Sequence, residues 1–169
     1  MALALIVLGV LLRVLPHAAN FTPIAAIALF GGVYLKRGHA VALPLAALVI
    51  SDIALGFDSL QSRLAVYGSF LLIGLVGLAV RNRKNVATVA GASIGGSAIF
   101  YLVTNFAYFY PPTMYPHTAG GVISSYYNAL PFFRNTLLGD LFYTGLLFGA
   151  YELAKWLAAR RPHRITSAA

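Results

Sequence analysis

The side chains that could bind or react are few in this chain. Its 169 residues include four Asp and Glu, four His and no Cys, which excludes disulfides, thiolate metal sites and a cysteine nucleophile. The sequence contains neither a Gly-rich phosphate loop with its Lys and Ser/Thr nor a His-Glu-x-x-His helix. We therefore predict a binding protein without covalent chemistry rather than an enzyme, and we identify no cofactor.

Polar residues recur at three places where apolar segments end, and these ends fall on the same side of the predicted topology. Arg13 ends the first segment, Asp52 closes the third, and Arg134 precedes the sixth. Because these segment ends share one level, we expect one outward-facing pocket. The candidate binding residues are Arg13, His17, Asn20, Thr22, Asp52, Asn105, Tyr108, Tyr115, His117, Arg134, Asn135 and Asp140.

Four of these candidates are charged, and charges at membrane depth are costly. Arg13, Asp52, Arg134 and Asp140 should therefore be paired or face a wet cavity. One interpretation is two structural ion pairs that hold the helices together. The other is a binding pocket in which Arg134 anchors an anionic group.

Two candidate segments also have a simpler interpretation as helix starts. Asn135 and Thr136 precede the sixth apolar run, and Asn20 and Thr22 precede Pro23. Such side chains cap free backbone N–H groups, and Pro fits the first helical turn. A helix N-terminus also favours anions, so capping and ligand binding both stay open.

A metal site is a weaker hypothesis. His17 and His117 fall on the outer side and could meet, together with Asp52 or Asp58. Either histidine could then serve as a metal ligand. No tight ligand spacing supports this arrangement, so no metal site is predicted.

Composition shows which elements must position these residues. Apolar residues make up 60% of the chain and charged residues 9%, whereas a soluble domain carries roughly 25% charged residues. We predict an all-α, polytopic membrane helical bundle of about six transmembrane segments, forming a single domain over residues 1–169. The segments are residues 2–15, 23–35, 40–55, 64–80, 87–108 and 136–158.

The predicted segments differ in length. The first three are short for a perpendicular crossing, which needs about 20 residues. The second could be a broken or re-entrant element, which is allowed only where protein buries it. Between the fifth and sixth segments, residues 122–133 are aromatic and polar, and predict a short interfacial helix.

Basic residues predict the orientation. With six crossings, nine Lys and Arg fall on one side and three on the other (Arg13, Arg63 and Arg134). The positive-inside rule then places both termini in the cytoplasm. Because these cations lie in loops beside apolar runs, we expect a lipid bilayer as partner and no nucleic acid. Residues 1–15 lack a basic start and a cleavage site, so we interpret them as a retained helix.

Two resemblances bear on function. The first rests on four runs of residues: Leu15-Pro16-His17-Ala18-Ala19-Asn20-Phe21-Thr22-Pro23, Ala28-Leu29-Phe30-Gly31-Gly32, Ser51-Asp52 and Phe132-Phe133-Arg134-Asn135-Thr136-Leu137-Leu138-Gly139-Asp140. In these runs the chain resembles a family of small uncharacterised bacterial membrane proteins, DUF6580, and this resemblance covers nearly its whole length.

More loosely, six segments, a Thr-Pro entry to the second and an Asp closing the third resemble the S-components of energy-coupling-factor transporters. That resemblance implies uptake of a vitamin or metal ion from outside, through a pocket of Asn20, Asp52, Asn105, His117 and Arg134. It includes solitary cobalamin transporters and implies an energising transporter module as partner. The Ala-x-x-x-Ala pattern for docking on that module is not evident in the first segment, and the cobalamin type's cysteine is missing.

We therefore expect a protein of the bacterial inner membrane that captures a small, vitamin-like solute from the non-cytoplasmic side. Cobalamin would then be a ligand and not a cofactor. One alternative is a structural or assembly subunit of a larger membrane complex, whose polar cluster is fully paired and leaves no cavity. The other is a lipid-modifying enzyme with Asp52 or His117 in a cleft that opens sideways to the bilayer.

Overall fold

The computed structural model describes residues 1–160, and within this part of the chain every regular element is a helix, without a β-strand. Arg161, His163 and Arg164 lie outside the described residues. The elements are α1 (Ala2–Val14), α2 (Ile24–Tyr34), α3 (Arg37–Leu55), α4 (Leu60–Val80), η1 (Arg81–Arg83), α5 (Val86–Thr104), η2 (Ala107–Phe109) and α6 (Ala119–Ala159).

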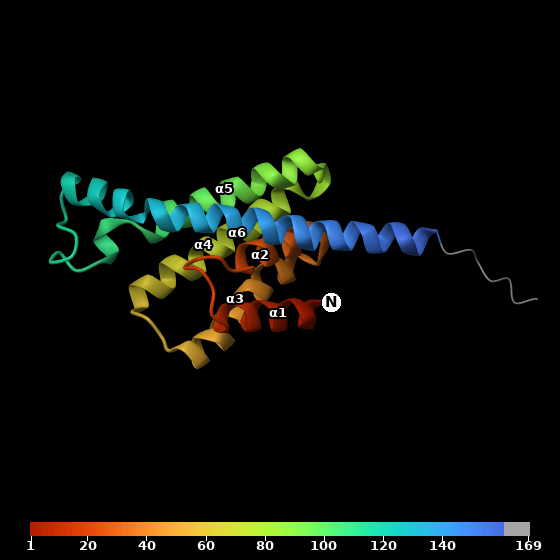
Figure 1. The fold of residues 1–169 in the computed structure, drawn as a ribbon, viewed down its shortest axis with the longest axis horizontal. Coiled ribbons are helices and arrows are strands. Elements are labelled where there is room, and N and C mark those ends of the chain that lie inside the picture. Colours follow the sequence, from red (N-terminus) through yellow and green to blue (C-terminus); the bar gives the residue numbers. More distant parts are fainter. Residues whose placement is uncertain (161–169) are drawn as a thin grey trace, which may run out of the picture.

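The helices lie roughly side by side along one long axis, and α6 extends beyond its neighbours at both ends (Figure 1). Within residues 1–160, three helices are long and apolar enough to cross a membrane: Arg37–Leu55, Leu60–Arg83 and Val86–Thr104. At 1.5 Å per residue, the 11 residues of α2 span only about 16 Å, roughly half of a bilayer core. Length and composition thus support three crossings directly.

Helix α2 occupies the centre of the bundle. Every residue from Ile24 to Val33 is buried. It packs against α3, α4 and α6, and α4 approaches it most closely. A Cβ on Gly32 would lie 2.5 Å from the Gly74 carbonyl oxygen, so glycine lets these two backbones touch. Because protein surrounds α2 on all sides, this short helix is shielded from lipid. Such burial is the condition under which a short second segment is allowed.

The predicted start of the sixth segment is wrong, because α6 begins much earlier in the chain. Residues 122–133 do not form a separate interfacial helix, because one 41-residue helix runs from Ala119 to Ala159 with Pro131 inside it. Thr118 caps its start, since its hydroxyl accepts a hydrogen bond from the Gly121 N–H at 3.2 Å. The predicted cap at Asn135 and Thr136 is therefore wrong: the Thr136 hydroxyl donates to the Phe132 carbonyl inside the helix.

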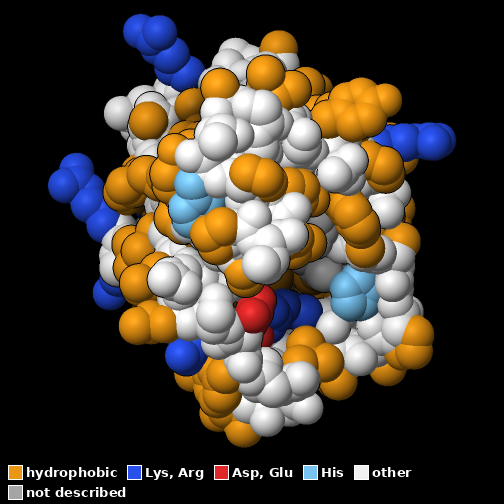
Figure 2. All heavy atoms as spheres, turned by 90° about the vertical axis from the view of Figure 1, so that its left-hand side faces the viewer, with side chains coloured by type: hydrophobic (Ala, Val, Ile, Leu, Met, Phe, Trp, Pro, Cys, Tyr) orange, Lys and Arg blue, Asp and Glu red, His pale blue; other side chains and the backbone are white. Residues whose placement is uncertain are grey.

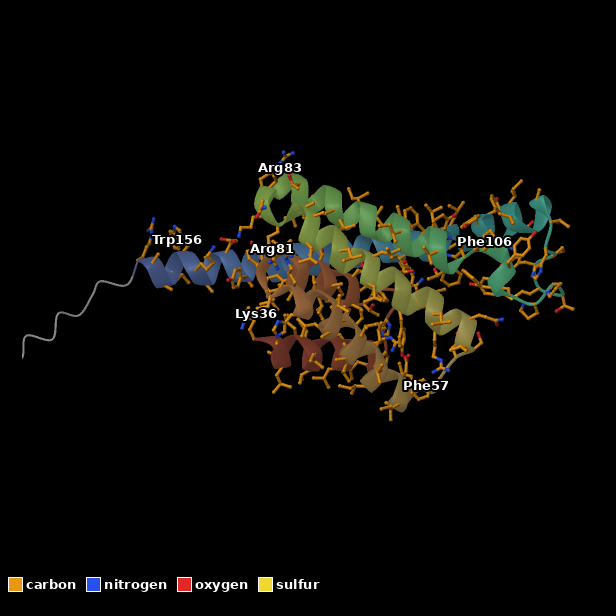
Figure 3. The ribbon with its side chains drawn as sticks, turned by 180° about the vertical axis from the view of Figure 1, so that it is seen from behind. Lys36, Phe57, Arg81, Arg83, Phe106 and Trp156 are labelled. Carbon is orange, nitrogen blue, oxygen red and sulfur yellow. The ribbon has the colours of Figure 1, made fainter. Side chains whose placement is uncertain are left out.

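The two ends of the bundle differ in charge. Lys36, Arg81 and Arg83 gather at one end together with Trp156, whereas Phe57 and Phe106 lie at the other (Figure 3). We call these the basic end and the opposite end. At the basic end Arg81 donates to the carbonyls of Gly32 and Leu35, which terminate α2. Large apolar side chains such as Leu3, Leu64 and Ile123 are exposed along the bundle, as lipid contact would require.

Candidate binding site

A charged hydrogen-bond network joins α1, α3 and α4 toward the opposite end. Arg13, in the last turn of α1, forms an ion pair with Asp52 and also donates to the Ser51 hydroxyl. The Tyr67 hydroxyl of α4 donates to the other Asp52 oxygen at 2.5 Å. The Asp52 side chain is only 7% exposed, so both carboxylate oxygens are buried with partners. Arg13 and Asp52, two of the four charged candidates, are therefore paired with each other.

The loop between α1 and α2 is held on α6 by one aromatic side chain. Asn20 adopts a left-handed backbone with φ of 62°, which Asn tolerates better than most residues. The turn places the Phe21 ring 5.5 Å from the Tyr143 ring. A Cβ on Gly139 would lie 3.1 Å from the Phe21 Cα, so glycine provides the space for the loop. Two motifs distant in the sequence therefore meet here.

A cavity of about 290 Å³ lies between this loop, α3, α4, α5 and α6. Figure 2 shows the face at this end, with a hollow bordered by acidic, basic and histidine side chains. Five of the twelve predicted residues line the cavity: Arg13, His17, Asn20, Thr22 and Asp140. The remaining lining residues are Ile24, Leu48, Leu55, Val66, Phe70, Phe100 and Thr136.

Asp140 reaches the cavity from the middle of α6. Its residue is 3% exposed, and its carboxylate accepts a 2.6 Å hydrogen bond from the Ser97 hydroxyl of α5. Arg134 and Asp140, the other two charged candidates, do not form an ion pair within residues 1–160. Arg134 is instead exposed and does not line the cavity, because it lies on another side of α6.

Four of the other predicted residues belong to the segment between α5 and α6, outside this cavity. The Tyr108 and His117 rings stack at 4.4 Å, and the Tyr108 hydroxyl donates to the His117 carbonyl at 3.1 Å. Tyr115 packs edge-on against Tyr110, and burial raises the pKa of Tyr110 above its ordinary value. Asn105 donates to the Tyr101 carbonyl. Asn135, inside α6, is likewise absent from the cavity lining.

These residues miss the cavity because of the length of α6. Its first turns carry the connecting segment past the level where α1 and α3 end (Figure 1). The aromatic residues of this segment therefore pack on one another. The aromatic walls of the cavity come from Phe70 and Phe100 instead.

The two outer histidines, His17 and His117, do not lie together in the structure. His17 borders the cavity, whereas His117 lies on Tyr108 and its Nε2 is 3.0 Å from the Tyr110 carbonyl oxygen. Within residues 1–160 no three His, Asp or Glu side chains are grouped so as to hold a metal ion.

One segment of α5 matches a catalytic motif by its residue spacing alone. Gly91-Ala92-Ser93-Ile94-Gly95 has the spacing of a hydrolase nucleophile motif, which requires a sharp strand-to-helix turn. Here Ser93 lies in the middle of α5, is buried, and is hydrogen-bonded to Thr144 at 3.2 Å. This serine therefore belongs to the packing of α5 against α6.

The structure adds partners that sequence reasoning missed. Tyr67 and Phe70 lie three residues apart on α4, as Ser97 and Phe100 do on α5. This is the spacing of neighbours on one helix face, and each pair contains a polar and an aromatic residue. A search for such pairs on the fourth and fifth segments could have found them.

A smaller cavity of about 110 Å³ adjoins the network of Arg13 and Asp52. Asp58 lines it from the α3–α4 loop. The Ser62 hydroxyl and the Ser59 N–H donate to this carboxylate at 2.7 Å each. These hydrogen bonds, followed by the nearby charge of Arg63, hold the pKa of Asp58 below its ordinary value.

The basic end has a cavity of its own, of about 320 Å³, between α5 and α6. Its floor is formed by small and apolar side chains such as Val89, Gly145 and Phe148. Lys84, Glu152 and Tyr34 border it, and Glu152 is held by Tyr34 and Lys155.

The fold and site define a helical protein with membrane-spanning helices and a polar cavity near one end. A family model for DUF6580, a family of unknown function, matches residues 1–163, so the chain belongs to this family. Searches of the curated proteins and of the solved structures found no match.

Proposed function

We propose that this chain is a multi-pass protein of the bacterial inner membrane with six crossings and both termini in the cytoplasm. The gathering of Lys36, Arg81 and Arg83 at one end supports this orientation, because cytoplasmic loops are enriched in Lys and Arg. The short α1 and α2 would cross as parts of the bundle, with α2 shielded from lipid by protein. The cavity then opens toward the non-cytoplasmic side.

In this orientation the protein binds and takes up a small solute from outside the cell. The observation that carries this proposal is the cavity, which combines apolar walls with polar groups from three separate parts of the chain: α1, the α1–α2 loop and α6. Such a combination is typical of small-molecule sites, which occupy roughly 300–1,000 Å³. A volume of about 290 Å³ favours a ligand much smaller than the corrin of cobalamin.

The cavity also weighs against the rival functions. A purely structural subunit requires no free volume among its buried polar groups, and a lipid-modifying enzyme requires a reactive pair of side chains in the cleft. Here Asp52 is engaged by Arg13 and Tyr67, and His117 lies outside the cavity. Uptake against a gradient would need an energising module as partner, as the S-component resemblance implies.

The test is native mass spectrometry of the full chain purified gently from its own host. We expect a co-purifying small molecule that is lost in Thr136→Phe, which fills the cavity. Ala90→Phe is the matched control, because it fills the cavity at the basic end. Thermal unfolding verifies that both variants fold. A ligand-free mass, with no stabilisation of the wild type by a broad solute panel, would refute the proposal.

A further inference from the structure

The four acidic residues of the chain differ in what balances their charge. Asp52 is paired with Arg13, and Glu152 with Lys155 at 3.1 Å. Asp58 is exposed in a loop and accepts hydrogen bonds from Ser59 and Ser62. Asp140 is the one acid in the described part of the chain that is buried without a cation in salt-bridge range.

The groups around Asp140 leave this charge unbalanced. From α5, Ser97 donates one neutral hydrogen bond. The other charged or titratable residues that line the same cavity are Arg13 and His17. Arg13 is already engaged by Asp52 and Ser51, and the Nδ1 of His17 lies 2.6 Å from the Leu15 carbonyl oxygen. The α6 side of the cavity is therefore its negative pole.

The apolar part of the cavity is also suited to a positive ligand. Phe70 of α4 and Phe100 of α5 both line it, with ring centroids 5.2 Å apart. Aromatic rings attract cations through their negative faces, and more strongly when water is excluded. Asn20, Thr22 and Thr136 add side-chain oxygens that can accept hydrogen bonds from N–H groups.

We infer that the solute is an organic ammonium ion, a protonated amine with a compact apolar body. The ammonium group pairs with Asp140, and the body lies against Phe70 and Phe100. This inference rests on the proposed function and names the ligand class of that site. It also explains why a carboxylate is kept at membrane depth, where an unpaired charge is costly: the bound cation completes the pair.

The test measures binding to the full chain in lipid nanodiscs by calorimetry and thermal shift. The amine probes are phenethylamine and cyclohexylmethylamine, with phenethyl alcohol and phenylacetate as matched neutral and anionic probes. We expect at least one amine to bind at least about tenfold more tightly than the alcohol and the acid, because a charge-assisted hydrogen bond exceeds a neutral one.

Asp140→Asn keeps the shape of the side chain and an oxygen that can accept from Ser97, but removes the charge. We expect it to weaken binding of that amine at least about tenfold. Asp58→Asn is the matched control, because it removes a negative charge at the same end of the bundle outside the main cavity. Its amine affinity should stay within about twofold of wild type.

The remaining outcomes separate this inference from the proposed function. If the alcohol or the acid binds as tightly as the amine, or if a folded Asp140→Asn protein keeps its amine affinity, the ligand class is wrong and the binding function stands. Stabilisation of wild type by sodium or potassium chloride alone, lost in Asp140→Asn, would assign the site to an inorganic cation. If no probe or salt binds and the purified protein carries no ligand, both proposals fail.

Discussion

The two larger cavities in the described part of the chain have similar volumes, but the charged residues that line them differ in burial. The cavity toward the opposite end, about 290 Å³, is lined by Arg13, Asp140 and several oxygen-bearing side chains. The cavity at the basic end, about 320 Å³, has a floor of small and apolar side chains. Free volume alone therefore does not identify the binding site. The difference lies in where charges are buried.

The charged side chains at the two ends differ in their exposure to solvent. At the basic end Glu152 and Lys155 are each about half exposed, at 49% and 51% of their side chains. Near the polar cavity Asp52 and Asp140 are buried. Exposed charges at a membrane surface cost little and serve orientation, whereas buried ones require partners and indicate function. The following predictions test this contrast, starting with the largest expected effect.

Removing one partner of the buried ion pair should destabilise the protein most. Asp52→Ala leaves the Arg13 guanidinium without its carboxylate, and we expect a loss of about 3–5 kcal/mol in unfolding free energy. Glu152→Ala breaks the exposed pair at the basic end and should cost much less, because solvent screens exposed charges. Denaturant unfolding in detergent micelles measures both. Equal losses would contradict the contrast between the two ends.

A side chain at Gly139 should disturb the loop that borders the polar cavity. Gly139→Leu displaces Phe21, and we expect a cost of about 1–3 kcal/mol together with weaker ligand binding. Gly145→Leu is the control, because a Cβ there meets nothing within 4 Å. It should leave ligand affinity unchanged. Thermal unfolding and calorimetry measure both effects in the two variants. A similar effect of both substitutions would refute the role of Phe21.

Asp58 should make a smaller, pH-dependent contribution. Its pKa is lowered in the folded protein, so its contribution to stability is present above its unfolded pKa and is lost as the pH falls through the folded value. Asp58→Asn should therefore reduce stability at neutral pH but less at pH values below about 4. Unfolding midpoints measured across pH would test this. A difference that grows toward acid pH would contradict it.

Arg134 should have the smallest effect. The sequence suggested this residue as an anchor for an anionic ligand, but its side chain is exposed and outside the cavity lining. Arg134→Ala should change solute affinity by less than about twofold. Asp140→Asn in the same assay shows the loss expected of a cavity residue. A large loss in Arg134→Ala would restore the original hypothesis of an anionic ligand.

Sequence reasoning found the helices but not every boundary. The first five apolar segments correspond to α1–α5 within a few residues, because a continuous apolar run is a strong helix signal in a chain with so few charges. The fusion of residues 122–133 with the sixth segment was missed. The aromatic and polar residues 122–133 and the polar pair Asn135 and Thr136 suggested a break, but the helix continues through them.

The site was predicted in part for similar reasons. A buried charge in an apolar chain needs a partner, so the pairing of Arg13 with Asp52 could be anticipated. The partner of Asp140 could not, because Ser97 is one of several small polar residues on α5. That His117 and Tyr108 lie outside the cavity could not be predicted, because sequence order does not show how far α6 carries their loop.

By itself the sequence determined that this chain is a helical protein with apolar segments, a cluster of basic residues toward one side and polar residues where segments end. Only the tertiary structure decided which polar residues share a cavity, that α2 is buried from Ile24 to Val33, and that Asp140 has no cation in salt-bridge range within residues 1–160. Composition and periodicity describe the chain one segment at a time. Which residues pair depends on the distances between helices. These distances exist only in the folded bundle, where Gly32 closely approaches Gly74 and Phe21 packs on Gly139.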